Sequence, residues 1–152
     1  MKGSDGDFTF QNIKLEGVTY AWKYDSQNNY WKASAFAGGV NNPTESWLVS
    51  TEIDLSGATT PSLSFDAAIN FLNGNNRADF IEAKISADYV DNVTTATWAT
   101  LNATWSEGKN WTFVNSGAID LKDYVGKKVR LAFAYPYDSE YAGFPLVTRL
   151  GI

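Results

Sequence analysis

The chain has 152 residues, a length that predicts one domain with an ordinary buried core. Its formal net charge is −5 and its pI is about 4.6, so nucleic acid, which needs a basic surface, is a poor partner. The absence of cysteine and histidine excludes disulfides, thiolate or histidine metal sites and serine-hydrolase triads.

The first seven residues form a short and polar stretch that does not resemble a secretion signal. We expect residues 1–7 to be a disordered or artificial N-terminus and the domain to span 8–152. No segment reaches the ~20 apolar residues that a membrane helix needs, so this domain is not expected to insert into a membrane. A native precursor could carry a leader or a lipid anchor.

The first third of the chain predicts short strands separated by turns rich in Asn, Ser and Gly. These strands are expected over 8–13, 18–24, 31–37 and 46–50, and Tyr20, Trp22 and Tyr24 would share one face. The turn at 25–29 offers oxygen atoms, which makes Asp25 and Asn28 candidate calcium ligands. The competing interpretation is a turn whose side-chain oxygens bind its own backbone.

One phrase of sequence occurs in both halves of the chain. Ile53-Asp54-Leu55 followed by Leu63-Ser64-Phe65 returns as Ile119-Asp120-Leu121 followed by Leu131-Ala132-Phe133, with Ser50 and Ser116 before the two copies. Each copy predicts a strand end, a turn and a buried strand, in the manner of a duplicated hairpin. The Leu and Phe positions are expected in the core, and Asp54 and Asp120 are expected to serve the turns.

Alternation of apolar and polar residues recurs throughout the chain and is strongest over 63–71, 81–87 and 129–135. Weaker strands are expected over 98–103, 111–116 and 146–152, and residues 91–98 could form one helical turn capped by Asp91 or Asn92. About ten short strands without a long helix predict an all-β fold: a jelly-roll-type antiparallel β-sandwich of two sheets.

Carboxylates are the only catalytic groups in good supply. Asp66, with Asn70 on the same strand face, and Glu82 on another strand are the candidates for a glycoside hydrolase, which needs two carboxyl groups flanking one cleft. The polar face of a strand usually carries such groups for solvation, and this interpretation is favoured.

Aromatic side chains in loops are the better candidates for a binding site, because flat rings match the C–H faces of sugars. The ligand-binding candidates are Trp98, Trp105, Tyr137, Asp138 and Tyr141. The competing interpretation is that these aromatics belong to the core or cover a sheet, and Trp47 and Trp111 are expected to be core residues.

Three stretches carry a resemblance to a known family: 47–57 followed by 63–66, 85–89 followed by 96–98, and 116–121 followed by 126–133. Over 8–152 they resemble the choice-of-anchor J and cleaved-adhesin domains of Bacteroidetes surface and secreted proteins. The resemblance implies a jelly roll at the cell surface or outside the cell that binds rather than catalyses. It also implies a structural calcium, but Thr51 replaces a usual Pro and the last strand lacks the usual acids.

We therefore predict a non-catalytic module, extracellular or on the outer-membrane surface, that binds a glycan or an extracellular protein. A structural spacer within a larger surface protein is the first alternative, and a glycoside hydrolase is the second. No cofactor is expected, or a structural calcium alone.

Overall fold

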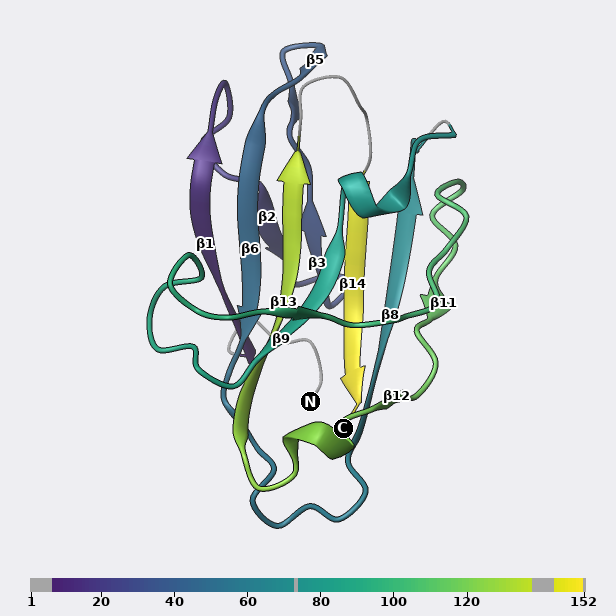
Figure 1. Ribbon diagram of the computed structural model, residues 1–152. Coiled ribbons are helices and arrows are strands. Elements are labelled where there is room, and N and C mark those ends of the chain that lie inside the picture. The colour runs from purple at the N-terminus through teal and green to yellow at the C-terminus, as the bar shows by residue number, and fades with distance from the viewer. Residues whose placement is uncertain (1–6, 73, 138–143, 152) are drawn as a thin grey trace.

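The computed structural model describes residues 7–72, 74–137 and 144–151, and in this part the chain forms fourteen strands and short 3₁₀ turns (Figure 1). All strand pairs are antiparallel. None of the described helices is long and apolar enough to cross a membrane. The predicted all-β sandwich is confirmed.

Two six-stranded sheets face each other, and each is named here after one of its long strands, β6 or β8. The β6 sheet has the order β1 (Phe8–Leu15), β6 (Thr44–Ser50), β13 (Lys128–Tyr137), β9 (Glu82–Ser86) and β10 (Ala99–Thr100), with β7 (Ile53–Asp54) paired to the start of β13. The β8 sheet has the order β11 (Val114–Asn115), β8 (Ser62–Asn70), β14 (Phe144–Gly151), β3 (Tyr30–Ala33) and β2 (Trp22–Asp25), with β12 (Ile119–Asp120) paired to β8. A small hairpin, β4 (Phe36–Ala37) and β5 (Val40–Asn41), lies apart from both sheets.

The core fills the space between the two sheets, as the alternating pattern predicts. Leu63, Phe65, Leu131 and Phe133 are all at most 1% exposed, and the rings of Phe65 and Phe133 meet edge to face at 5.0 Å. Burying each such side chain contributes on the order of 2 kcal/mol. Trp22 adds a directional contact, because its indole N–H donates to the backbone oxygen of Ser46 at 3.1 Å across the sandwich.

The duplicated phrase does not form two local hairpins, and this prediction is wrong in an instructive way. Ile53 of β7 pairs with Val129 of β13, and Ile119 of β12 pairs with Leu63 of β8. The short strand of each copy therefore pairs with the long strand of the other copy. Turns carry the chain from one sheet to the other within each copy, so a local partner is out of reach.

Ser50 and Ser116 also connect each copy of the phrase to the long strand of the other copy. The backbone N–H of Leu131 donates to Ser50 Oγ at 3.0 Å, and that of Phe65 donates to Ser116 Oγ at 2.9 Å. Each hydroxyl in turn donates to the backbone oxygen of the next residue, at 2.8 Å in both copies. The two copies thus interlock through buried strand ends.

The aspartates of the phrase serve their turns, as predicted. Asp54 accepts the backbone N–H of Ser56 at 2.9 Å, and Asp120 accepts that of Lys122 at 2.8 Å. Hydrogen bonds from the Ser56 side chain and then its backbone hold the pKa of Asp54 below its usual value. These carboxylates are scaffold groups.

The helical turn expected over 91–98 is a non-helical turn instead. Asn92 Oδ1 accepts both the backbone N–H and the hydroxyl of Thr94, at 2.9 and 2.8 Å. The short 3₁₀ helices lie elsewhere, at Arg77–Asp79 and Lys122–Tyr124. There are also more strands than the expected ten, because two-residue pairs such as β7 and β12 are too short to show alternation.

Candidate functional site

The outer face of the β6 sheet is covered by the segment that follows β9, residues 87–98. Gln11 on β1 holds this segment: its Nε2 donates to the Tyr89 hydroxyl at 2.7 Å and to the Asp91 backbone oxygen at 2.6 Å. Its Oε1 accepts the backbone N–H of Val93 at 3.0 Å. Because both the nitrogen and the oxygen of the Gln11 amide form hydrogen bonds to the covering segment, Gln11 fixes this segment to the sheet.

Trp98, a predicted ligand-binding residue, is the last residue of this segment and packs on the outer face of the β6 sheet. Its ring centroid lies 5.2 Å from that of Trp47 and 5.9 Å from that of Tyr89, and its N–H donates to the Val93 backbone oxygen at 2.9 Å. Trp47 thus packs on the outside of the sheet and not in the core between the sheets. One edge of Trp98 lines a hollow of about 520 Å³ that also includes Ile85 and Tyr124.

Asp88 closes the base of the covering segment. Its Oδ1 accepts the backbone N–H of Thr97 at 2.7 Å and the hydroxyl of Ser86 at 2.8 Å. These hydrogen bonds, the Thr97 backbone first, hold the pKa of Asp88 below its usual value. The ionised carboxylate therefore stabilises the closed segment.

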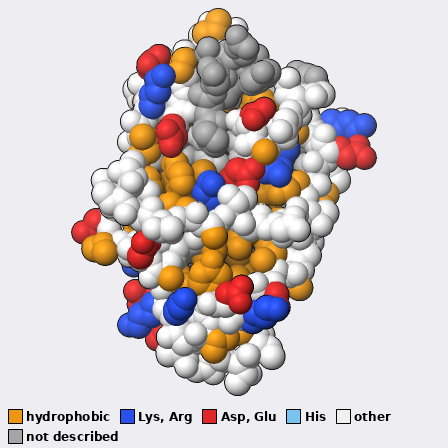
Figure 2. Space-filling model, in the orientation of Figure 1, with side chains coloured by type: hydrophobic (Ala, Val, Ile, Leu, Met, Phe, Trp, Pro, Cys, Tyr) orange, Lys and Arg blue, Asp and Glu red, His pale blue; other side chains and the backbone are white. Residues whose placement is uncertain are grey.

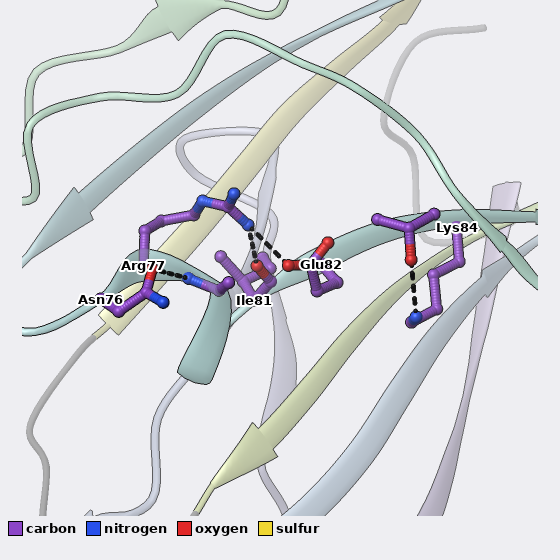
Figure 3. A network of polar contacts seen from close by, with 7 residues as sticks. Asn76, Arg77, Ile81, Glu82 and Lys84 are labelled. Atoms are coloured by element: carbon purple, nitrogen blue, oxygen red, sulfur yellow. Dashed lines mark hydrogen bonds and ion pairs between the residues drawn. The ribbon is translucent and has the colours of Figure 1, made fainter.

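Trp105, a second predicted residue, lies on the segment that crosses from the β6 sheet to the β8 sheet after β10 (Figure 1). Its ring packs against Phe65 at 5.2 Å, and the Arg77 guanidinium lies over it, 4.7 Å from its centroid. The Arg77 Nη1 donates to the Ile81 backbone oxygen at 2.6 Å and pairs with Glu82 at 3.2 Å (Figure 3). An arginine held by two acceptors covers the ring, and Trp105 packs against the main core whereas Trp98 packs against the separate cluster of Val49, Val93 and Ala132.

Figure 2 shows this side of the molecule. Apolar side chains gather in patches above and below the crossing segment, and acidic and basic groups separate the patches. The arrangement fits aromatics that cover sheets better than one continuous binding platform.

The remaining predicted ligand residues are at the limit of what the structure describes. The backbone of Tyr137 pairs with Thr44 at the end of β13, while Asp138 and Tyr141 lie outside the described residues. Thr44, the partner of Tyr137, follows the hairpin of β4 and β5 by three residues, since β5 ends at Asn41. These three residues stay a prediction.

The predicted calcium ligands form a turn. Asp25 Oδ1 accepts the backbone N–H groups of Gln27 and Asn28 at 3.0 and 3.1 Å, and its Oδ2 accepts Asn28 Nδ2 at 2.9 Å. These hydrogen bonds, the Asn28 amide first, lower the pKa of Asp25. Asn28 thus presents its nitrogen to the carboxylate, so a cation would have to displace these donors. Among the described residues no three acidic side chains gather as a metal-binding group.

The two carboxylates weighed for glycoside hydrolysis lie on different sheets. Asp66 on β8 accepts Asn115 Nδ2 at 2.8 Å, whereas Glu82 on β9 is paired with Arg77. Each carboxylate has a structural partner, and their separation onto two sheets does not place them across one cleft.

The outer surface of the β8 sheet offers a different environment at its β2–β3 edge. A hollow of about 690 Å³ is lined by residues 17–21, by Lys23 and Lys32, and by residues 34, 36 and 37. Tyr20 is 48% exposed and Phe36 is 52% exposed, so both rings are open to a ligand. The volume falls within the range of ~300–1,000 Å³ typical of small-ligand sites.

The wall that carries Phe36 is a tight hairpin. Gly38 and Gly39 have φ of 62° and 79°, which is the left-handed pair that a two-residue type I′ turn requires. Asn42 fixes the hairpin from below, since its Nδ2 donates to the backbone oxygens of Ala35, Ala37 and Val40 at 3.0, 3.4 and 3.3 Å. The exposed ring of Phe36 therefore lies on a hairpin that is held in place by hydrogen bonds.

Trp111 adds an aromatic ring next to Lys32, although it does not line the hollow. It was expected in the core, but it is only partly buried and meets Phe71 edge to face at 6.0 Å. Trp111 and Phe71 have φ of 51° and 62°, an uncommon conformation for bulky residues. Asn70 Oδ1 supports it by accepting the backbone N–H groups of Phe71 and Asn110, at 2.8 and 3.1 Å.

A second hollow, of about 510 Å³, adjoins the first and shares Tyr20 and Lys23 with it. Trp31 lines it and is 4% exposed, and its Nε1 is buried without a hydrogen-bond partner in the described part of the chain. The concave surface at the β2 edge is thus larger than the first hollow alone.

The sequence does not predict this surface, although it does predict the turn that joins its two strands. The turn at 26–29 fixes a hairpin register in which Asp25 faces Tyr30 and Lys23 faces Lys32. Tyr20 was expected on a strand face with Trp22 and Tyr24, but β2 begins only at Trp22, and Tyr20 lies in the exposed loop before it.

Comparisons with known proteins agree on the fold. No family model and no curated protein sequence matches the chain. Among solved structures, the K1 cleaved adhesin domain of Lys-gingipain from Porphyromonas gingivalis W83 is 15% identical, with a TM-score of 0.61 over 99% of this chain and 94% of that one. The K2 domain of the same protein is 17% identical, with a TM-score of 0.57 over 95% and 89%.

Sugar-binding proteins share the same fold. The module TmCBM61, solved in complex with β-1,4-galactotriose, is 10% identical, with a TM-score of 0.53 over 97% of this chain and 88% of that one. Lectin I-B4 from Griffonia simplicifolia is 9% identical, with a TM-score of 0.51 over 97% and 94%. The predicted cleaved-adhesin-like sandwich is therefore confirmed as a fold, at identities that carry no binding residues across.

Proposed function

We propose that the domain is a non-catalytic extracellular binding module and that a glycan binds in the hollow at the β2–β3 edge. The observation that carries the proposal is the pair of exposed rings, Tyr20 and Phe36, that both line one preformed concavity. Such rings can stack on the C–H faces of sugar units, and Ser34 and the lysines supply partners for hydroxyl groups. The shared fold with TmCBM61 and lectin I-B4 supports the proposal.

A non-catalytic role is supported by the carboxylates. Asp66 and Glu82 are both engaged in hydrogen bonds, and they lie on different sheets. The similarity to adhesin and sugar-binding modules points the same way.

The test is a glycan array followed by calorimetry on the best ligand. Tyr20→Ala and Phe36→Ala should each weaken binding about tenfold or more, equivalent to ~1.4 kcal/mol. Phe113→Ala is the matched control, because Phe113 is 43% exposed but does not line the hollow. If Trp98→Phe or Tyr141→Ala abolishes binding while Tyr20→Ala does not, the loop residues expected from the sequence form the site and the hollow does not.

An extracellular protein is the second candidate ligand, favoured by the exposed apolar residues of the β4–β5 hairpin. Val40 is 57% exposed beside Phe36, but it does not line the hollow. A protein partner would bury both side chains, as aromatic and aliphatic anchors do at interfaces. Val40→Ser should therefore weaken binding of a protein and leave binding of a glycan unchanged.

A further inference from the structure

Two lysines on adjacent strands line the hollow. Lys23 on β2 and Lys32 on β3 are register partners, and both side chains line the concavity. Like charges directly opposite on a sheet are destabilising. Neither lysine forms an ion pair within the described part of the chain, although the protein carries five more acidic than basic groups.

Aromatic rings hold the two ammonium groups in place. Lys23 Nζ lies 5.9 Å from the centroid of Tyr20, and Lys32 Nζ lies 5.7 Å from that of Trp111. Contacts at this distance orient a cation without neutralising it. The positive charge of the pair therefore stays available to a ligand.

The walls around the lysines are fixed before any ligand arrives. Gly17, at φ +77°, packs so closely on Asn42 that an added Cβ would lie 2.1 Å from Asn42 Oδ1. Because Asn42 also holds the hairpin that bears Phe36, the loop with Tyr20 and the hairpin are braced by one side chain. A preformed site lowers the entropy lost on binding.

We propose that the ligand of this hollow is an acidic glycan, whose carboxylate or sulfate group binds between Lys23 and Lys32 while a sugar ring stacks on Tyr20 or Phe36. The inference rests on the glycan-binding function proposed above and adds the charge class of the ligand. An acidic peptide would meet the same charges but would not use two flat rings at the walls in this way. Nucleic acid is disfavoured by the net charge of −5.

Calorimetry of the wild-type protein with three sets of oligosaccharides tests the proposal: oligogalacturonates, heparin-derived sulfated oligosaccharides and neutral galactan oligosaccharides. We expect at least one acidic set to bind about tenfold or more tightly than the neutral set, with an affinity that falls as salt rises. The two acidic sets separate a carboxylate from a sulfate as the bound group.

The decisive variant is Lys23→Gln with Lys32→Gln. It should abolish the preference for the acidic set and leave the weaker neutral binding in place. The control is Lys122→Gln with Lys128→Gln, which removes the same two charges from η3 (Lys122–Tyr124) and the start of β13 at the opposite end of the sandwich (Figure 1). The control should bind like the wild type.

The outcomes separate the two proposals. Equal binding of neutral and acidic sets, unchanged in the lysine variant, overturns the acidic ligand and keeps the glycan function. Binding of no glycan overturns both. Binding of poly-glutamate as tight as that of the acidic sugars overturns the sugar and identifies an acidic peptide as the ligand.

Discussion

The two outer faces of the sandwich differ in what lies over their aromatic residues. On the β6 sheet, Trp47 packs with Tyr89 and Trp98 of the covering segment, which Gln11 and Asp88 hold closed. At the β2–β3 edge of the β8 sheet, Tyr20 and Phe36 remain about half exposed on braced walls. The same residue types therefore serve as cover on one face and as an open surface on the other.

The comparison shows that the neighbours of an aromatic residue, and not its presence in a loop, decide its role. Trp98 finds an acceptor for its N–H and two rings within its own sheet face. The Tyr20 ring instead contacts Lys23 and lines an open hollow. Each prediction below changes one side of this contrast.

Truncation of the covered cluster should have the largest effect. Trp98→Ala removes two ring contacts and a hydrogen bond, and we expect a loss of about 3 kcal/mol in the free energy of unfolding. Tyr20→Ala on the open face should change it by no more than about 0.5 kcal/mol. Urea denaturation measures both, and equal losses would contradict the contrast between the faces.

Release of the covering segment should have the next largest effect. Gln11→Ala removes three hydrogen bonds to 89–93, with an expected cost of about 2 kcal/mol. Hydrogen exchange at the Val93 amide should accelerate. Thr9→Ala, an exposed neighbour on β1, is the control, and an unchanged Val93 amide in Gln11→Ala would show that other contacts hold the segment.

Acid should loosen the same segment. The pKa of Asp88 is lowered in the folded protein, so its stabilising effect is present above the ordinary carboxyl pKa and is lost as pH falls through the folded pKa. Protonation weakens the hydrogen bond from Thr97. NMR of the Thr97 amide should report this change below the ordinary carboxyl range, and Asp88→Asn should remove the pH dependence.

Reversal of one charge in the hollow should have a small effect of opposite sign. Lys23→Glu replaces a repulsive pair with an attractive one opposite Lys32, and we expect a gain of about 0.5 kcal/mol in stability. Binding of an acidic glycan should be lost at the same time. A destabilised variant would indicate that the contact of Lys23 with Tyr20 outweighs the repulsion.

Calcium should have the smallest effect. Because the oxygens of Asp25 already accept hydrogen bonds within their turn, millimolar calcium should leave the melting temperature unchanged. A rise in melting temperature that Asp25→Ala abolishes would establish the calcium site expected from the sequence.

The sequence predicts the sandwich because the core depends on a local signal. Alternation in β8 and β13 places Leu63, Phe65, Leu131 and Phe133 in the core whatever their partners are. The pairing of β7 and β12 could not be predicted in this way, since their partners are distant in the sequence and the strands have two residues each. Local hairpins were the natural and wrong expectation.

The candidate site was harder to predict for two physical reasons. Trp111 lies outside the core and its backbone takes a left-handed conformation, which the pattern of side chains does not predict. Lys23 and Lys32 belong to ordinary alternating strands, and what distinguishes them is that neither forms an ion pair with any acidic residue that the structure describes. Tyr20 is adjacent to a strand in sequence but is exposed because β2 starts two residues later.

The exchange of short strands between the two copies of the repeated phrase has a consequence for how the chain folds. Neither half can complete its strand ends alone, because Ser50 serves Leu131 and Ser116 serves Phe65. Contacts between residues so far apart in sequence require large loops to close before they stabilise anything, and such topologies fold in about milliseconds to seconds. We expect one cooperative transition on that timescale, in which the two halves of the chain become ordered together.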